Sequence, residues 1–155
     1  MNRVLFVDQR NNGQSQIAEA FFNQHASGKA RAFSAGMHYT TYIDPTLTQA
    51  MKEVGLDLGN KQPKVTTPEL VMLADRIISI GCGKASICPS IFVTGEEWEV
   101  ENPVGKPIEK VRMIRDELKD RVLKLIHETY PQTLKDCPEL SGLITTVTHV
   151  EVSTS

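Results

Sequence analysis

A polar loop near the start of the sequence carries the residues with the clearest potential for chemistry. It spans residues 9–15, Gln-Arg-Asn-Asn-Gly-Gln-Ser, and follows Asp8 at the end of an apolar run. The run predicts a buried strand, and the apolar residues after Ser15 predict the first turns of a helix. A loop that joins a strand to a helix start presents backbone N–H groups and the positive end of the helix dipole to one point. The pattern therefore predicts a site shaped for oxyanions such as phosphate.

Several segments beyond the loop extend this pattern. They are Ser34-Ala35-Gly36 after a short apolar run, Pro63-Lys64, Gly81-Cys82-Gly83 followed by Cys88-Pro89, and Trp98 followed by Asn102-Pro103-Val104-Gly105. With the loop, they resemble the low-molecular-weight protein tyrosine phosphatases and the thioredoxin-coupled arsenate reductases built on the same fold, from about Arg3 to Thr129. This resemblance implies an α/β three-layer sandwich around a four-stranded parallel sheet with strand order 2-1-3-4.

The resemblance assigns catalytic roles to three positions that hold other residues here. The family signature Cys-x-x-x-x-x-Arg-Ser would place the thiolate nucleophile at Asp8 and the oxyanion-binding arginine at Gln14, and the family's general acid would stand at Asn102. A carboxylate at position 8 repels a dianion by about 4 kcal/mol per charge pair, at ~4 Å and an effective dielectric of roughly 20. Gln14 carries no charge, and Asn102 cannot hand a proton to a leaving group. The sequence thus predicts a pseudoenzyme, a catalytically impaired homologue that acts as a binding or regulatory module.

The rest of the loop retains polar and small residues. Asn11 and Ser15 match the family, in which the asparagine holds the loop shape and the serine hydroxyl supports the nucleophile. With Asn12 and Gly13 they form the predicted ligand-binding segment. They are equally good turn and helix-cap residues. Arg10 would supply a cation only if it turned inward, and its place in the family pattern predicts an outward side chain.

An alternative hypothesis is an enzyme of this class with altered chemistry. Asp8 would then be the nucleophile, although the related pattern of haloacid-dehalogenase-type phosphatases needs a second aspartate where Arg10 stands. In another version Cys82 and Cys88 form a redox pair, since the resemblance places the resolving cysteines of the arsenate reductases there. The alternative without a redox function is that Cys82 and Cys88 are two reduced thiols. The sequence predicts no metal and no cofactor, because Asp8 has no second carboxylate close in sequence and a zinc site would need two more ligands besides the cysteines.

The composition excludes several broad classes of protein. The 155 residues fit one domain, and 40% hydrophobic with 23% charged residues is typical of a globular protein. A net charge of -2 gives no general attraction to nucleic acid or to an anionic membrane. No apolar stretch approaches the roughly 18 residues of a membrane helix. Residues 1–3 lead directly into the first predicted strand, so we expect no signal peptide. Three cysteines do not make a secreted disulfide framework, so we expect a cytoplasmic protein; the oligomeric state stays open.

Strands and helices alternate along the chain, which predicts a parallel sheet with helices on both faces. We expect strands at residues 3–7, 30–34 and 76–80, and helices at 15–26 with Ser15 as N-cap, at 45–54 after Asp44 and at 68–74 after Thr67. Residues 81–107 are predicted to be a loop. A long helix is predicted after Pro107, with apolar residues at steps of three and four. Its solvent-exposed face is predicted to consist of Arg112, Arg115, Asp116, Lys119 and Asp120.

We place the family-like domain at residues 1–130 and a C-terminal extension at residues 131–155. The extension contains a Thr- and Val-rich run at 143–150 with β-propensity. It would be an edge strand, a partner-binding arm or a disordered tail, and it is the predicted contact for a protein partner.

Overall fold

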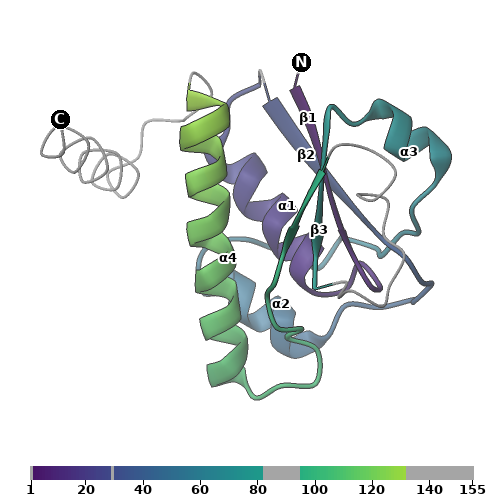
Figure 1. Cartoon of the computed structure of the whole chain (residues 1–155). Coiled ribbons are helices and arrows are strands. Elements are labelled where there is room, and N and C mark those ends of the chain that lie inside the picture. The colour runs from purple at the N-terminus through teal and green to yellow at the C-terminus, as the bar shows by residue number, and fades with distance from the viewer. Residues whose placement is uncertain (1, 29, 82–94, 132–155) are drawn as a thin grey trace, which may run out of the picture.

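A four-stranded parallel sheet forms the centre of the protein in the computed structural model, which describes residues 2–28, 30–81 and 95–131. The strands are β1 (Asn2–Asp8), β2 (Ala30–Gly36), β3 (Arg76–Ile80) and β4 (Gly95–Trp98), in the order β2-β1-β3-β4 (Figure 1). β1 lies in the middle of the sheet, and its residues 4–7 are fully buried, as a central parallel strand requires. The predicted sheet and its order 2-1-3-4 are confirmed.

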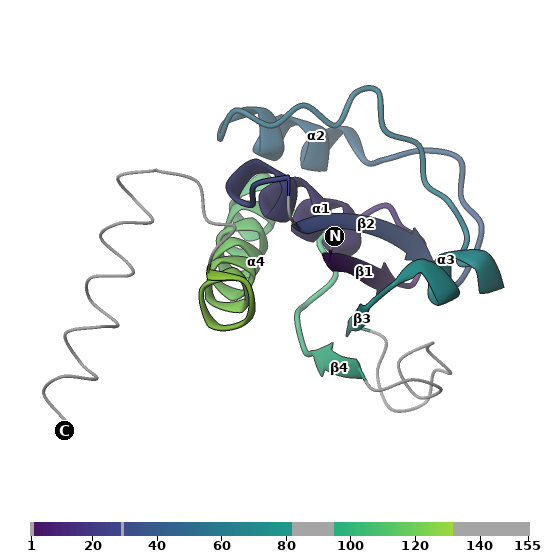
Figure 2. The ribbon, with the colours of Figure 1, turned by 90° about the horizontal axis from the view of Figure 1, so that it is seen from above.

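Helices cover both faces of the sheet (Figure 2). α1 (Gln14–His25), α2 (Pro45–Lys52) and α4 (Ile108–Thr129) lie on one side, and α3 (Pro68–Leu73) lies on the other. The side chains of a strand alternate between its two faces. Val4 and Phe6 therefore pack in the main core with α1 and α4, whereas Leu5 and Val7 pack in a smaller core beneath α3. These two cores give the three layers that the resemblance implied.

Two helix starts form as the sequence predicts. Asp44 caps α2, because its Oδ1 accepts the Thr46 amide at 2.9 Å. Its second oxygen, Oδ2, accepts the backbone N–H of Gly105 at 3.2 Å. Thr67 caps α3 through a hydrogen bond of 3.2 Å from the Leu70 amide. Both caps satisfy amide groups that the first turn of a helix leaves without partners.

The start of α1 and the position of β4 differ from the sequence prediction. α1 has Gly13 as its N-cap, without a side-chain cap, and Ser15 lies inside the first turn. The prediction of Ser15 as N-cap is therefore wrong, because Ser15 bonds within the preceding loop instead. The prediction of a loop over residues 81–107 is wrong for β4. This edge strand contains two glutamates, so it lacks the apolar pattern that marks a buried strand.

α4 packs its apolar residues on the sheet, but it also buries one residue of the face that was predicted to be solvent-exposed. Its buried apolar residues are Val111, Ile114, Leu118, Val122, Leu123, Leu125 and Ile126. Arg115 is only 8% exposed, so the prediction that it faces solvent is wrong. Its Nη1 donates to the Ala50 carbonyl at 2.8 Å and to Glu53 Oε1 at 2.9 Å. α2 therefore covers this arginine, and the charge is satisfied at the end of that helix.

Some predicted features lie outside the described residues. Cys82 and Cys88 fall in residues 82–94, and all but the first residue of the predicted interaction arm, residues 131–155, falls in residues 132–155. The redox pair and the arm therefore stay predictions. Within the described residues, no helix is both long enough and apolar enough to cross a membrane.

Candidate functional site

The loop after β1 lies at the carboxyl end of the sheet, where open parallel sheets place their binding sites. Residues 9–13 connect β1 to α1. The loop is held against the end of β2, because the Met37 amide donates to the Asp8 carbonyl at 3.0 Å. Gly36 allows this close approach, since a Cβ atom there would lie 2.5 Å from the Asn11 nitrogen. Backbone contacts with β2 therefore set the path of the loop.

Asp8 turns its carboxylate into the loop. Oδ1 accepts the Asn11 amide at 2.5 Å, and Oδ2 accepts the Ser15 amide at 2.9 Å. The residue is 1% exposed. Burial raises the pKa of Asp8 above its ordinary value of 3.8, and the hydrogen bonds from Ser15 and Asn11 oppose this rise only in part. The base of the loop thus holds an acidic group that is bound by the loop's own amides.

Asn11 joins the loop to three other segments. Its backbone has φ 55°, a left-handed conformation that asparagine tolerates better than most residues. Nδ2 donates to Ser15 Oγ at 2.8 Å and to Ser34 Oγ at 2.9 Å. Oδ1 accepts Gln16 Nε2 at 2.9 Å and the Lys64 amide at 3.0 Å. Asn11 and Ser15 therefore meet, and the asparagine side chain fixes the shape of the loop.

The other two positions with predicted catalytic roles are Gln14, the first residue of α1, and Asn102, which lies between β4 and α4. Gln14 is buried, and its Nε2 donates to the Val100 carbonyl at 3.1 Å. Asn102 is exposed, and its Oδ1 accepts the Val104 amide at 3.0 Å. A Cβ atom on Gly13 would lie 3.2 Å from this Oδ1, so Asn102 borders the loop directly. The structure brings positions 8, 14 and 102 to one loop, and each of the three side chains is bonded to backbone.

Asn12 and Arg10 complete the loop. Asn12 is buried, whereas Arg10, the single basic residue among positions 8–15, is exposed. The described interior of the loop therefore has no positive side chain of its own. Within residues 2–28, 30–81 and 95–131, no three His, Cys, Asp or Glu side chains are grouped in a way that would hold a metal ion.

Two buried polar residues of the site, Gln16 and Ser34, had no predicted role. Both contact Asn11, and both are at most 1% exposed. Gln16 is the third helical residue after the N-cap Gly13, and a glutamine at this position is a recognised signal of a helix start. Ser34 faces the site only because β2 pairs with β1 in a register that sets it opposite Phe6. That register is not visible in the local sequence around Ser34.

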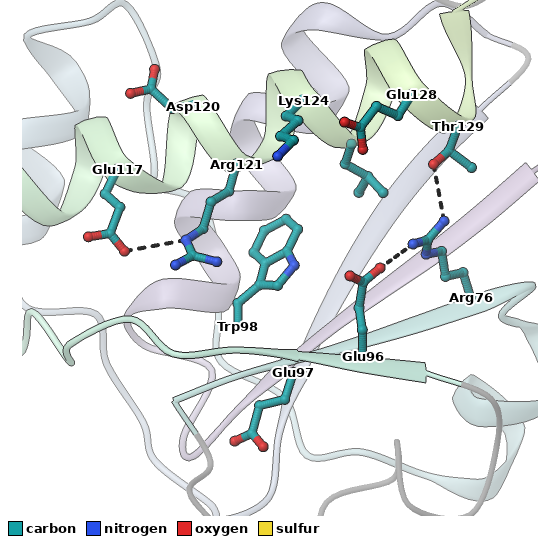
Figure 3. A pocket seen from close by; sticks show the side chains of 11 residues that line it. Arg76, Glu96, Glu97, Trp98, Glu117, Asp120, Arg121, Lys124, Glu128 and Thr129 are labelled. Atoms are coloured by element: carbon teal, nitrogen blue, oxygen red, sulfur yellow. Dashed lines mark hydrogen bonds and ion pairs between the residues drawn. The ribbon is translucent and has the colours of Figure 1, made fainter.

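A separate cavity of about 590 Å³ lies between β4 and the carboxyl-terminal half of α4 (Figure 3). Its lining is mixed in charge, since Arg76 pairs with Glu96, and Arg121 pairs with Glu117 at 3.4 Å. The Arg121 guanidinium lies 6.0 Å from the centre of the Trp98 ring. These five residues lie on β3, β4 and α4, and none of them belongs to the loop. We therefore place the candidate site at the loop.

Comparison with known proteins relates the whole domain to phosphatases and arsenate reductases. Residues 3–136 match the family described as low molecular weight phosphotyrosine protein phosphatase. The chain is similar to a glutaredoxin arsenate reductase from Synechocystis sp., with 33% identity over 129 residues that cover 81% of this chain and 97% of the relative. It is also similar to an arsenate reductase from Staphylococcus aureus, with 31% identity over 119 residues that cover 75% of this chain and 89% of the relative.

Solved structures agree with this relationship. An arsenate reductase in the phosphate binding state superimposes with a TM-score of 0.72 and 32% identity, over 83% of this chain and 98% of that chain. An arginine phosphatase from Geobacillus stearothermophilus superimposes with a TM-score of 0.71 and 21% identity, over 85% of this chain and 95% of that chain, which shows a common fold. The chain belongs to the low molecular weight phosphotyrosine protein phosphatase family.

Proposed function

We propose that the protein is a catalytically impaired homologue of the arsenate reductases and low-molecular-weight phosphatases, and that it acts as a binding or regulatory module. The observation that carries this proposal is the Asp8 carboxylate, which the Asn11 and Ser15 amides bind at the base of the loop. In the family pattern this position belongs to a thiolate nucleophile. The first cysteine of the sequence is Cys82, so the segment that forms the loop supplies no thiol.

Asp8 is a poor candidate for a replacement nucleophile. A nucleophile has to face the reacting atom of a substrate. Both oxygens of Asp8 accept amide hydrogen bonds from the loop instead, and the residue is 1% exposed. This orientation supports a structural role for Asp8 and gives no support to a phosphatase that uses it.

The loop also lacks a cation that would hold an oxyanion. In the family pattern an arginine at position 14 clamps two oxygens at once, and its charge makes those hydrogen bonds strong. Gln14 is neutral, and it donates to the Val100 carbonyl. The loss of a single donor from an oxyanion site reduces the rate of an enzyme by about 10²–10³. Replacement of a bidentate charged donor by an amide that bonds elsewhere therefore favours an impaired site.

Position 102 supplies a further argument for impairment. A side-chain amide has no proton to transfer at neutral pH, so Asn102 does not suit the role of general acid. Its Oδ1 accepts the Val104 amide and holds the turn before α4. Glu101 is adjacent, but its carboxylate pairs with Lys106 at 3.7 Å and with Lys110 at 3.3 Å. These ion pairs support a surface role for Glu101 in the same turn.

Turnover assays test the proposal directly. The protein would be incubated with p-nitrophenyl phosphate, and separately with arsenate together with thioredoxin or glutaredoxin and their reductants. The Staphylococcus aureus arsenate reductase serves as the positive control for reduction. We expect rates equal to those of heat-treated protein. Turnover that increases with protein concentration, and that disappears in Asp8→Ala or in Cys82→Ser, would overturn the proposal and support the enzyme alternative.

A reconstructed variant distinguishes a local loss of chemistry from a defect of the scaffold. It combines Asp8→Cys, Gln14→Arg and Asn102→Asp. We expect this triple variant to hydrolyse p-nitrophenyl phosphate and Asn102→Asp alone to remain inactive, because a general acid contributes its usual factor of about 10²–10⁴ only to a reaction that already proceeds. A folded but inactive triple variant would place the impairment outside these three positions.

The proposal includes residues 131–155 as an arm that contacts a protein partner in the cytoplasm. Its support comes from the sequence alone, through the β-prone run at 143–150. Cross-linking in cells would compare the full chain with a chain that ends at residue 130. A partner that cross-links equally well to both would contradict the role assigned to the arm.

A further inference from the structure

An exposed surface lies beside the loop, on the side where β2 ends. We call it the basic surface, and it consists of Arg10, His38, Tyr39, Tyr42, Lys64 and Val65. All six residues are exposed, so this surface is separate from the buried interior of the loop. We propose that the basic surface docks an acidic segment of a partner protein. The inference rests on the proposed function and deepens it, since it names the class of partner that a binding module would take.

Hydrogen bonds of the backbone bring three segments together at this surface. The His38 amide donates to the Gln9 carbonyl at 2.7 Å, so the segment after β2 follows the loop. The Lys64 amide donates to Asn11 Oδ1 at 3.0 Å, so the segment before α3 reaches the same loop. These contacts join parts of the chain that are far apart in sequence. The three segments are residues 9–13, 36–43 and 60–67.

The three segments contain no aspartate and no glutamate, although the whole chain has 19 acidic and 17 basic residues. Arg10 and Lys64 are exposed, and neither side chain pairs with an acid within the part of the chain that the structure describes. Lys61 is left out of the surface because it pairs with Glu19 at 3.4 Å. The basic surface is therefore a local positive patch on a protein of net charge -2, and it attracts acidic groups.

Two tyrosines supply the apolar part of the basic surface. Tyr39 is 73% exposed and Tyr42 is 59% exposed. Both lie in the segment between β2 and α2, which is held at its far end because Asp44 Oδ2 accepts the Gly105 amide. Tyrosine is enriched in protein interfaces, since it offers a large apolar contact and a hydroxyl group at a low cost in conformational entropy. The tyrosines therefore suit apolar side chains that alternate with the carboxylates of a partner segment.

An acidic protein segment fits this surface better than a nucleic acid does. Single-stranded nucleic acid also stacks on aromatic side chains, but its affinity depends on a groove whose cations follow a chain of phosphates. The basic surface has two side chains with a full and unpaired positive charge, Arg10 and Lys64. Two charges and two tyrosines match a short segment with a few carboxylates and one or two apolar residues.

Fluorescence anisotropy with a defined probe tests the inference. The probe is a labelled peptide that repeats Glu-Glu-Leu-Asp, and a labelled single-stranded thymidine oligonucleotide is the comparison. We expect the wild-type protein to bind the peptide, and to bind the oligonucleotide at least about tenfold more weakly. Arg10→Glu combined with Lys64→Glu should weaken peptide binding at least about tenfold, because two attractive charges become repulsive. Tyr39→Ala combined with Tyr42→Ala should weaken it about fivefold or more.

The matched control combines Arg31→Glu with Lys124→Glu. It makes the same change in net charge at two exposed positions, one near the start of β2 and one on α4. Salt screens charges at this distance from the basic surface, so the control should bind the peptide within about twofold of the wild type. An equal loss of affinity in the control, tighter binding of the oligonucleotide, or no binding of the peptide by the wild type would overturn the inference.

The outcomes are distinct from those of the turnover assays. Turnover by a wild-type protein that also binds the peptide at the basic surface would remove the proposed function alone. An inactive wild-type protein that does not bind the peptide would remove only this inference.

Discussion

Gln14 and Val100 are joined across 86 positions of the sequence by a hydrogen bond of 3.1 Å from the side-chain amide to the backbone carbonyl. The contact is buried, and it ties the start of α1 to the segment after β4. Gly81, which follows β3, lies against both partners. Three segments that are distant in sequence are therefore packed together at one side of the loop.

Gly81→Ala should destabilise the protein by about 2–4 kcal/mol. Gly81 has φ +66°, and an added Cβ atom would lie 2.6 Å from Gln14 Nε2 and 3.0 Å from the Val100 carbonyl oxygen. The matched control is Gly105→Ala, whose φ is +79° but whose Cβ would meet no atom within 4 Å. The control should lose only about 1–2 kcal/mol, the cost of the backbone conformation. Urea unfolding measures both losses, and equal values would contradict the crowding at Gln14.

Substitutions of Asn11 should separate its side-chain contacts from its backbone conformation. Asn11→Gly removes the four side-chain hydrogen bonds and tolerates φ 55°, so we expect a loss of about 2–4 kcal/mol. Asn11→Ala should lose about 1 kcal/mol more, because alanine is strained at a positive φ. Chemical denaturation gives the order of stability. An alanine variant that is more stable than the glycine variant would show that the loop changes its conformation.

Glu53 should make the stability of the protein sensitive to acid. A hydrogen bond from Arg112 at 2.6 Å, with further help from Arg115, lowers the pKa of Glu53 from 4.5 to about 2. Between these two pH values the unfolded chain binds the proton and the folded chain does not. The contribution of Glu53 is therefore complete above pH 4.5 and is lost as the pH falls toward 2. Glu53→Gln should flatten this part of a pH series of urea midpoints, whereas Glu117→Gln, which breaks an exposed ion pair with Arg121, should keep the decline.

Asp8 should have the opposite effect on the pH dependence of stability, because its contribution falls as the pH rises. Burial raises the pKa of Asp8 above 3.8, so the folded protein still binds this proton at pH values where the unfolded chain has lost it. The contribution of Asp8 to stability therefore falls as the pH rises from 3.8 through the raised pKa. Thermal unfolding of the wild type and of Asp8→Asn would be measured at successive pH values. We expect the wild type to lose stability relative to Asp8→Asn as the pH rises over this interval. A difference that is constant with pH would contradict the burial of an ionisable group at position 8.

The fluorescence of Trp98 should report whether Arg121 contacts its ring in the cavity between β4 and α4. It is the single tryptophan of the chain, and the Arg121 guanidinium lies 6.0 Å from the centre of its ring. Arg121→Ala should lower stability by about 0.5–1 kcal/mol and should shift the fluorescence emission to longer wavelength, because water replaces the cation over the ring. Lys124→Ala is the control, since Lys124 lines the same cavity. If both variants shift the emission equally, the stacking of Arg121 on Trp98 does not determine the signal.

The parts of the fold that depend on neighbours in sequence could be predicted. The apolar residues of β1 identify a buried strand, and Asp44 and Thr67 identify the starts of α2 and α3, because a cap bonds to amides two or three positions away. β4 could not be found in this way, since its two glutamates carry no apolar signal. The burial of Arg115 was also missed, because it depends on α2, which reaches this arginine only in the folded protein.

The site shows the same division between local and distant contacts. The sequence places Asp8 at the end of β1 and predicts that its charge repels an anion. It does not predict that the carboxylate binds the loop's own amides, because that orientation depends on the left-handed backbone of Asn11 and on the close approach that Gly36 allows. The bond between Gln14 and Val100 likewise requires the order of the sheet to be known.

The two oxygens of Asp44 couple a helix to the rim of the loop. One accepts the Thr46 amide at the start of α2, and the other accepts the Gly105 amide in the turn before α4. The same turn carries Asn102, whose side chain borders Gly13. A molecule that displaces α2 would therefore displace this turn as well, because the Asp44 carboxylate is hydrogen-bonded to both.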